Sequence, residues 1–348
     1  MNHLLDFSQE QLADWLGERG HPAYRVKQIW QWLCVRRVSD FESMTNLPQT
    51  LREELAGEFV LSTTTVAKHN ESADGTEKLV LQLGDGGRIE CVLLRDGQRR
   101  SICISSQVGC AMGCVFCASG LDGVDRNLTT GEIIEQILLL QRLLPLDERL
   151  SHIVVMGMGE PLANLSALLP ALDMASSPQG LGISSRKITI STVGLPAAID
   201  QLRDHATLYP LAVSLHAPND ELRNKIVPVN KNIGLTEIMQ AADRYFDASG
   251  RKLTFEYVLL AEVNDQLQHA EQLARLLRGR NALLNVIPYN TVAGLPYQTP
   301  SVGSIKRFRE VLEAAGVNVQ FRQRKGDDIN AACGQLRRQT VVELKTQD

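Results

Sequence analysis

The chain has 348 residues with a formal net charge of −4, and 44% of them are hydrophobic. This length and composition predict a globular protein with one large domain and a smaller one, or with two ordinary domains. The net charge argues against a histone-like protein that binds nucleic acid through charge alone, although a locally basic face is compatible with RNA binding.

Two features of the sequence bear on where the protein acts. No run of 18 consecutive apolar residues occurs, so no transmembrane helix is predicted. The first residues include Asp6, Glu10 and Asp14 and do not resemble a secretory signal. We therefore expect a cytoplasmic location, where seven cysteines are more commonly ligands, catalysts or core residues than partners in structural disulfides.

The first 95 residues change from a helical pattern to a strand pattern. Helices are predicted over 8–20, 23–37 and 47–59, with Ser8 as an N-cap. Between 60 and 95 apolar residues recur with a period of two, and the segment GDGG at 84–87 predicts a hairpin turn.

From residue 100 onward, short apolar runs alternate with helical patterns. The predicted strands are 101–105, 152–157, 187–191, 209–215, 253–260, 283–288 and 317–322. About six βα units in series predict an α/β fold with a parallel sheet, either doubly wound or closed into a partial or full barrel. In both folds the functional residues lie at the carboxyl ends of the strands.

These patterns divide the chain into four parts. We expect an N-terminal helical accessory domain (1–60), a β-hairpin extension (61–95), a core (96–335) and a C-terminal tail (336–348).

Three cysteines follow the first core strand with the spacing C-x3-C-x2-C. They are Cys110, Cys114 and Cys117, in the segment SSQVGCAMGCVFCASG. One interpretation is a zinc site with a fourth ligand from elsewhere in the chain. Another is a four-iron cluster with three thiolate ligands and one iron open to a further ligand. Three unrelated core cysteines are the third interpretation.

Later strand ends carry further candidates for the same site. The second core strand ends in VVMGMGEP, where Gly159 permits close approach of a ligand to the backbone beside Glu160. Ser191, Ser214 and Asn290 also follow strands, which predicts one shared pocket. His216 is either part of that pocket or a structural histidine.

The cysteine triplet, with Phe116 before its last cysteine, resembles the cluster motif of radical S-adenosylmethionine (SAM) enzymes. The resemblance implies a partial (βα)6 barrel and a [4Fe–4S] cluster held by the three cysteines, with SAM on the open iron. It further implies a set of residues that contact SAM: Gly159, Glu160, Ser191, Ser214, Leu215, His216 and Asn290.

Two more cysteines, Cys103 and Cys333, extend the resemblance over essentially the whole chain to the RlmN/Cfr family of RNA adenine methyltransferases. The matching segments are CISSQVGCAMGCVFC, RNLTTGEI, VVMGMGEPLAN, KITISTVG, SLHAPND, IVPVNK with Arg223 before it, IPYN and GDDINAACGQL. Pro161 and the residues before Cys333 are similar to the C2-methylating RlmN branch rather than the C8-methylating Cfr branch. Asn330 departs from the Asp of the family pattern.

The resemblance also implies a reaction that consumes two SAM molecules per turnover. The first methylates Cys333, and a 5′-deoxyadenosyl radical from the second activates that methyl group for addition to adenine. Cys103 then forms a transient disulfide with Cys333, which releases the product. Glu90 matches the proton acceptor of the family. Cys103 is an alternative acceptor, and Glu90 is alternatively an outward-facing strand residue.

The implied substrates are one adenosine in the peptidyl-transferase centre of 23S rRNA and the adenosine 3′ of the tRNA anticodon. An electron donor such as flavodoxin is implied, and we expect a monomer. The basic segments 95–101 and 322–325 suit RNA phosphates beside the site, whereas 24–37 is either an RNA-contacting face or an ordinary amphipathic helix. The alternatives are a C8 methyltransferase, another radical SAM enzyme, or a zinc or cluster module without catalysis.

Overall fold

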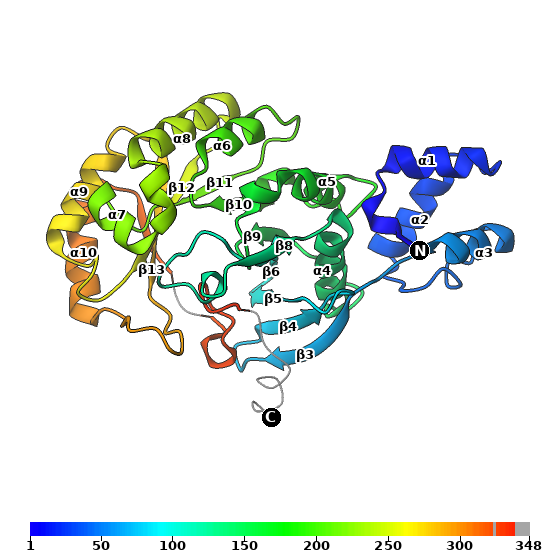
Figure 1. Cartoon of the computed structure of the whole chain (residues 1–348), viewed down its shortest axis with the longest axis horizontal. Helices are drawn as coiled ribbons and strands as arrows, with labels where there is room; N and C mark the ends of the chain where they lie inside the picture. The colour runs from blue at the N-terminus through cyan, green and yellow to red at the C-terminus, as the bar shows by residue number, and fades with distance from the viewer. Residues whose placement is uncertain (323–324, 338–348) are drawn as a thin grey trace.

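The structure is a computed structural model that describes residues 1–322 and 325–337 (Figure 1). In this described part, ten strands form one central sheet in the order β14-β13-β12-β11-β10-β9-β6-β5-β4-β3. Every neighbouring pair from β14 to β6 is parallel. These strands are β6 (Arg99–Cys103), β9 (His152–Val155), β10 (Ile188–Thr192), β11 (Leu211–Ser214), β12 (Leu253–Leu259), β13 (Ala282–Pro288) and β14 (Val319–Phe321).

Each parallel strand before β14 is followed by one or two helices. These helices are α4 (Thr130–Arg142), α5 (Leu165–Ser176), α6 (Pro196–Arg203), α7 (Asp220–Ile226), α8 (Leu235–Ser249), α9 (Leu267–Leu277) and α10 (Val302–Ala314). The arrangement confirms the predicted partial (βα)6 barrel, whose sheet stays open because β14 and β3 are its end strands. Within the described residues, no helix combines the length and apolarity needed to cross a membrane.

An antiparallel extension continues the sheet beyond β6. It consists of β5 (Arg88–Asp96), β4 (Glu77–Gln82) and β3 (Thr65–Glu71). The predicted hairpin turn is confirmed, because the amide of Leu83 donates to the carbonyl of Gly87 at 2.8 Å between β4 and β5. The register pairs Val80 with Glu90 and Val92 with Cys103, so Glu90 and Val92 point to one face of the sheet.

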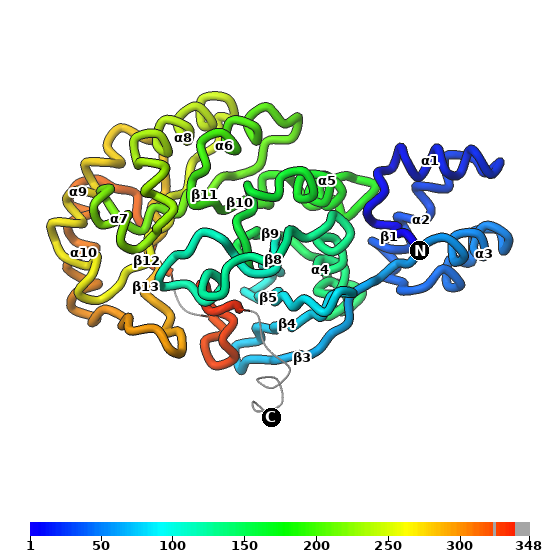
Figure 2. Tube along the Cα trace, in the orientation of Figure 1, coloured from blue at the N-terminus to red at the C-terminus, as the bar shows by residue number. Residues whose placement is uncertain are grey.

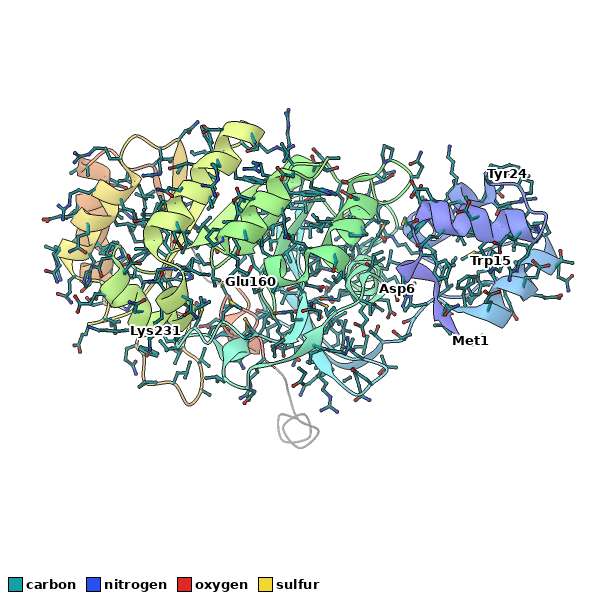
Figure 3. All side chains as sticks on the ribbon, turned by 45° about the horizontal axis from the view of Figure 1, so that its top comes forward. Met1, Asp6, Trp15, Tyr24, Glu160 and Lys231 are labelled. Carbon is teal, nitrogen blue, oxygen red and sulfur yellow. The ribbon has the colours of Figure 1, made fainter. Side chains whose placement is uncertain are left out.

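The accessory part contains the three predicted helices, α1 (Gln9–Glu18), α2 (Arg25–Cys34) and α3 (Gln49–Glu58). Ser8 forms the predicted cap, since its side chain accepts from the amide of Gln11 at 3.1 Å. Short strands β1 (Asn2–His3) and β2 (Phe59–Val60) pair in parallel, so the two ends of this part meet. Figures 2 and 3 show it at one end of the molecule, with Trp15 inside it.

A buried carboxylate joins the accessory part to the core. Glu135 of α4 accepts hydrogen bonds from the ring of His3 and from the amides of Thr63 and Thr64, at 2.7 and 3.0 Å for the two amides. Asp6 adds a second contact by accepting from the amide of Gly131 at 2.6 Å. Trp30 is also buried, so α2 turns this tryptophan inward as an amphipathic helix does.

Candidate active site

The cysteine triplet lies on a loop whose ends are held together by a short hairpin that the sequence did not reveal. Strands β7 (Gln107–Gly109) and β8 (Val124–Asn127) pair in antiparallel fashion at the base of the loop. The amide of Cys110 donates to the carbonyl of Gly123 at 2.8 Å. Gly109 has φ +80°, and a Cβ there would lie 2.1 Å from that carbonyl oxygen, so only glycine fits.

The three thiols line one cavity of about 120 Å³ at the carboxyl ends of the parallel strands. Across the described residues, no three His, Cys, Asp or Glu side chains converge on one point as the ligands of a single metal ion do. Burial raises the pKa of Cys110 to about 11, and it also raises the pKa of Cys114 and Cys117. Three thiols of one loop form a soft donor set of the kind that binds iron–sulfur clusters.

Glu160 forms one wall of this cavity, near the centre of the molecule (Figure 3). Its carboxylate accepts from the amides of Leu162 at 3.0 Å and Val193 at 2.9 Å. Burial raises its pKa, although these hydrogen bonds act in the opposite direction. The preceding Gly159 has φ +104°, and a Cβ there would lie 2.7 Å from the Cβ of Gln107. The backbone is therefore packed so closely that position 159 requires glycine.

Two serines from neighbouring strands face the same cavity. The hydroxyl oxygens of Ser191 and Ser214 lie 3.5 Å apart, and Ser191 donates to Glu256 at 3.2 Å. Glu256 is a buried carboxylate of β12 that sequence analysis missed. The signal available was a charged residue within the otherwise apolar run of that strand.

His216 is held in an unusual conformation at the edge of this cavity. Its φ of +58° is left-handed, and its ring packs edge-on against Phe116 with centroids 4.9 Å apart. Its Nδ1 accepts from the amide of Val258 at 3.0 Å, which places the proton of the neutral ring on Nε2. Burial lowers the pKa of His216 to about 3, so the ring is neutral. The neighbouring Leu215 is buried and lines neither this cavity nor the next among the described residues.

A second cavity of about 430 Å³ contains the predicted cysteine pair. Both Cys103 and Cys333 line it, and Cys333 lines the first cavity as well. Burial raises the pKa of the Cys103 thiol to about 12, whereas Cys333 is exposed. Arg99, Arg322 and Lys325 border this second cavity with positive charge. All seven cysteines are free thiols in the structure.

The loop that carries Cys333 is hydrogen-bonded to the barrel and to the loop that carries the cysteine triplet, which we call the cluster loop. Asn290 donates to the carbonyl of Cys333 at 3.0 Å, and the amide of Ala118 donates to the carbonyl of Gly334 at 2.8 Å. The Oδ1 atom of Asn290 is buried and has no hydrogen-bond partner in the described structure, which suits a ligand that donates to it. Figures 1 and 2 show this red segment beside β3 and β4.

Glu90 does not face outward as one interpretation of its strand position held, because its side chain has no exposed surface. It lies on β5 two residues before Val92, on the face that borders the second cavity. Its carboxylate pairs with Lys78 Nζ at 3.0 Å and accepts from the amide of Arg337 at 3.0 Å. Burial raises its pKa, against the effect of Lys78.

Arg223 of α7 is a fully buried cation to which sequence analysis gave no role. Its guanidinium donates to the carbonyls of Val193 at 2.6 Å, Ser214 at 3.0 Å and Leu215 at 3.0 Å. The amide of Val115 in the cluster loop also donates to the carbonyl of Ile226 at the end of α7, at 3.1 Å. Arg223 therefore fixes the ends of two site strands and the helix that supports the cluster loop.

Two family models match the chain. The Radical SAM superfamily matches residues 104–277, and the ribosomal RNA large subunit methyltransferase N-terminal domain matches residues 2–61. The chain is similar to a crystal structure of a radical SAM methyltransferase from Sphaerobacter thermophilus, with a TM-score of 0.93 and 42% identity over 97% of this chain and 99% of the other.

Curated relatives match over nearly the full length. A probable dual-specificity RNA methyltransferase RlmN of Rhodopirellula baltica is 66% identical over 337 residues, which cover 97% of this chain and 91% of the relative. A relative with the same name from Symbiobacterium thermophilum is 45% identical over 334 residues, which cover 95% of this chain and 90% of the relative.

The barrel and the cysteine triplet, together with these matches, define a radical SAM enzyme, a class that uses a [4Fe–4S] cluster and SAM. Within that class, the chain belongs to the RlmN family and is a radical SAM RNA methyltransferase.

Proposed function

We propose that the chain methylates C2 of an adenine in RNA and that Cys333 carries the methyl group before transfer. The proposal depends on one observation, which is that Cys103 and Cys333 line one cavity that meets the thiol-lined cavity at Cys333. A thiol at this junction is accessible from both sides. It is thus suited to receive a group on one side and to deliver it on the other.

Cys110, Cys114 and Cys117 would hold the [4Fe–4S] cluster, and the fit is supported by three thiols of one loop that share a cavity. The bound cluster supplies the electron that cleaves SAM. A zinc module without catalysis, which is the alternative interpretation of the triplet, would not require the second cysteine pair, Cys103 and Cys333. The family also implies two SAM molecules per turnover.

The strand ends around the first cavity would bind SAM. Gly159, Glu160, Ser191, Ser214 and His216 all line it, and the Nε2 proton of neutral His216 is a donor at its edge. Leu215 belongs to the SAM-binding set that the family implies, but it lines neither cavity, and its amide and carbonyl bond to Glu256 and Arg223. It would therefore position its neighbours Ser214 and His216 rather than contact SAM.

Asn290 would contact the same cofactor from the second cavity. Its Nδ2 atom donates to the carbonyl of Cys333, while its buried Oδ1 atom is available as an acceptor. One side chain would then touch both the cofactor and the loop that carries the methyl group.

The second cavity would receive the target adenosine. Its volume of about 430 Å³ suits an extruded nucleotide, and Arg99, Arg322 and Lys325 at its border suit RNA phosphates. Of the predicted basic segment 322–325, residues 323 and 324 lie outside the described part of the chain.

Glu90 would accept the proton that the ring loses, and Cys103 would form a disulfide with Cys333 to release the product. A raised pKa makes the Glu90 carboxylate a stronger base than an exposed one. Because the Arg337 amide covers one carboxylate oxygen, proton transfer needs a bridging water or a shift of the loop.

The substrates we propose are the adenosine of the 23S rRNA peptidyl-transferase centre and the adenosine 3′ of the tRNA anticodon. The named relatives are dual-specificity RNA methyltransferases, which supports two RNA substrates. We also propose that the enzyme acts as a cytoplasmic monomer with a flavodoxin as electron donor.

The test is anaerobic turnover with 23S rRNA and tRNA fragments, followed by mass spectrometry of the nucleosides and of the protein. We expect 2-methyladenosine in both RNAs and an added methyl group on Cys333. Cys333→Ala abolishes both products, whereas Cys34→Ala, a buried cysteine outside both cavities, retains them. Methylation at C8, or full activity of Cys333→Ala, would refute the proposal.

A further inference from the structure

Lys78 is a buried lysine in the middle of the extension. Its side chain is 2% exposed, and its Nζ lies 3.0 Å from Oε1 of Glu90, whose side chain is 0% exposed. Lysine is almost never fully buried unless it is paired, and a buried pair brings a desolvation cost that good geometry must offset. The fold therefore keeps two charges here that an apolar pair could replace.

The pair lies on the cavity side of the extension. In the register of β4 and β5, Lys78 is opposite Val92 and Val80 is opposite Glu90, so Lys78 and Glu90 are diagonal neighbours on one face. Val92 on that face lines the second cavity. The charged groups that act on Glu90 are Lys78 from β4 and Arg337 from the C-terminal loop.

Each member of the pair also bonds to the loop that carries Cys333, and the two contacts lie on opposite sides of this cysteine. Lys78 Nζ donates to the carbonyl of Asn330 at 3.1 Å, three residues before Cys333. Oε2 of Glu90 accepts from the amide of Arg337 at 3.0 Å, four residues after it. Asn330 has φ +51°, a left-handed conformation that asparagine tolerates, and its turn presents the carbonyl to Lys78.

We infer that Lys78 is a positioning residue, which together with Glu90 forms a clamp on both flanks of the Cys333 loop. The clamp consists of four groups: the Lys78 ammonium, the Glu90 carboxylate, the Asn330 carbonyl and the Arg337 amide. It holds Cys333 at the junction of the two cavities. The inference rests on the proposed function only in taking Cys333 as the residue that carries the methyl group.

The remaining contacts of the loop fix other positions than the clamp does. Asn290 and Ala118 hold the carbonyls of Cys333 and Gly334, which fixes the tip of the loop to the barrel. The extension also binds the start of the loop, since the Ser72 hydroxyl donates to Asp328 at 2.6 Å and Asp74 accepts from the amide of Gly326 at 3.0 Å. Lys78 bonds to the carbonyl of Asn330, and Glu90 to the amide of Arg337, so the clamp acts on the residues closer to and beyond Cys333. Loss of Lys78 therefore loosens the loop at Asn330, while its first residues and its tip stay attached.

The experiment is hydrogen exchange by mass spectrometry on the full chain, read from peptides that cover 326–337. Lys78→Met is expected to speed exchange in this loop about fivefold or more, as the loss of one hydrogen bond implies for a local opening. Lys78→Arg keeps a cationic donor at this position, so we expect its Cys333 loop to exchange as slowly as that of the wild type. Lys306→Met is the matched control, because the Lys306 side chain on α10 is 76% exposed.

A double variant protects the test against misfolding. Lys78→Met alone leaves the Glu90 charge buried without its partner, which can unfold the extension, whereas Lys78→Met/Glu90→Met replaces the pair by apolar side chains of similar size. The inference is overturned if the double variant, with unchanged exchange in β12 and β13, exchanges its Cys333 loop at the wild-type rate. If Lys78→Met speeds exchange in the Cys333 loop but the wild-type protein does not methylate RNA, the proposed function is refuted and the inference about the clamp stands.

Discussion

The amide of Ala118 donates a hydrogen bond to the carbonyl of Gly334 at 2.8 Å, and this contact joins the two cysteine loops of the site. Ala118 follows the last cysteine of the triplet, and Gly334 follows Cys333. Ser119 strengthens the junction by donating to the carbonyl of Leu336 at 2.5 Å. The loop of the cysteine triplet and the loop of Cys333 are therefore placed as one unit, although more than 200 residues separate them in the sequence, as Ser119 and Leu336 differ by 217 positions.

Replacement of one triplet cysteine should remove the metal centre. Cys114→Ser is expected to lower the iron content after anaerobic reconstitution from about four per chain, the value for one cluster. Iron and acid-labile sulfide assays measure this change. Cys34→Ser, which alters a buried cysteine outside the site, is expected to keep the wild-type content. A colourless wild-type protein that carries zinc would contradict the cluster assignment.

The buried guanidinium of Arg223 should contribute strongly to stability. Arg223→Met leaves the carbonyls of Val193, Ser214 and Leu215 without their donor, and we expect a loss of about 3–5 kcal/mol in unfolding free energy. Urea unfolding followed by circular dichroism tests this value. Arg275→Met, at a side chain that is 60% exposed, should stay within about 0.5 kcal/mol of wild type. Equal midpoints for the two variants would show that Arg223 is dispensable.

Two glycines provide a matched pair for the backbone at the cofactor cavity. Gly159→Ala adds a Cβ at 2.7 Å from the Cβ of Gln107 in a left-handed conformation. We expect SAM binding to weaken by about tenfold or more, because close backbone approach at this position is lost. Gly57→Ala in α3 meets nothing within 4 Å and should stabilise the chain by about 0.5–1 kcal/mol. Calorimetric titration with SAM and thermal melting measure the two effects.

The joint between the accessory part and the core should weaken in acid. Burial acts to raise the pKa of Glu135, but hydrogen bonds from His3, Thr64, Thr63 and Ser62 outweigh it and lower the pKa to about 2. A depressed carboxylate pKa stabilises the fold above the unfolded value near 4.5, and this contribution of about 3 kcal/mol disappears as the pH falls toward 2.

Glu135→Gln isolates this effect. The variant should be less stable than wild type at pH 7, and the difference should shrink between pH 4.5 and pH 2 because the wild type loses its charge in that interval. Unfolding by urea at several pH values measures the difference. A difference that stays constant with pH would exclude the Glu135 charge as its source.

Much of the fold could be predicted because its signals are local. The period of two in the extension, the turn at 84–87 and the alternation of strands and helices after residue 100 correspond to observed elements. The hairpin of β7 and β8 was missed because each strand is short and its partner lies beyond the cysteine loop. No local pattern encodes such a pairing.

The residues of the candidate site also fall into those that local sequence signals predicted and those that they did not. Residues at strand ends, such as Glu160 and Ser191, were predictable because a parallel sheet brings its carboxyl edges together. Lys78 and Glu256 were missed, and Arg223 was matched to the family without a role, because the importance of these residues lies in burial and in partners elsewhere in the fold. The local signal was a single charged residue inside an apolar run, and such a residue does not indicate which side chain it contacts in the fold.

The loop that carries Cys333 follows all strands of the sheet that the structure describes, and it contacts both the extension and the barrel. During translation the ribosome therefore releases the thiol triplet and the whole sheet before it releases this cysteine. A nascent chain therefore contains the loop of the cysteine triplet well before it contains Cys333. The order of the site residues along the chain thus separates the synthesis of the triplet loop from that of Cys333, and a chain that stops before residue 333 would lack the thiol that we propose as the methyl carrier.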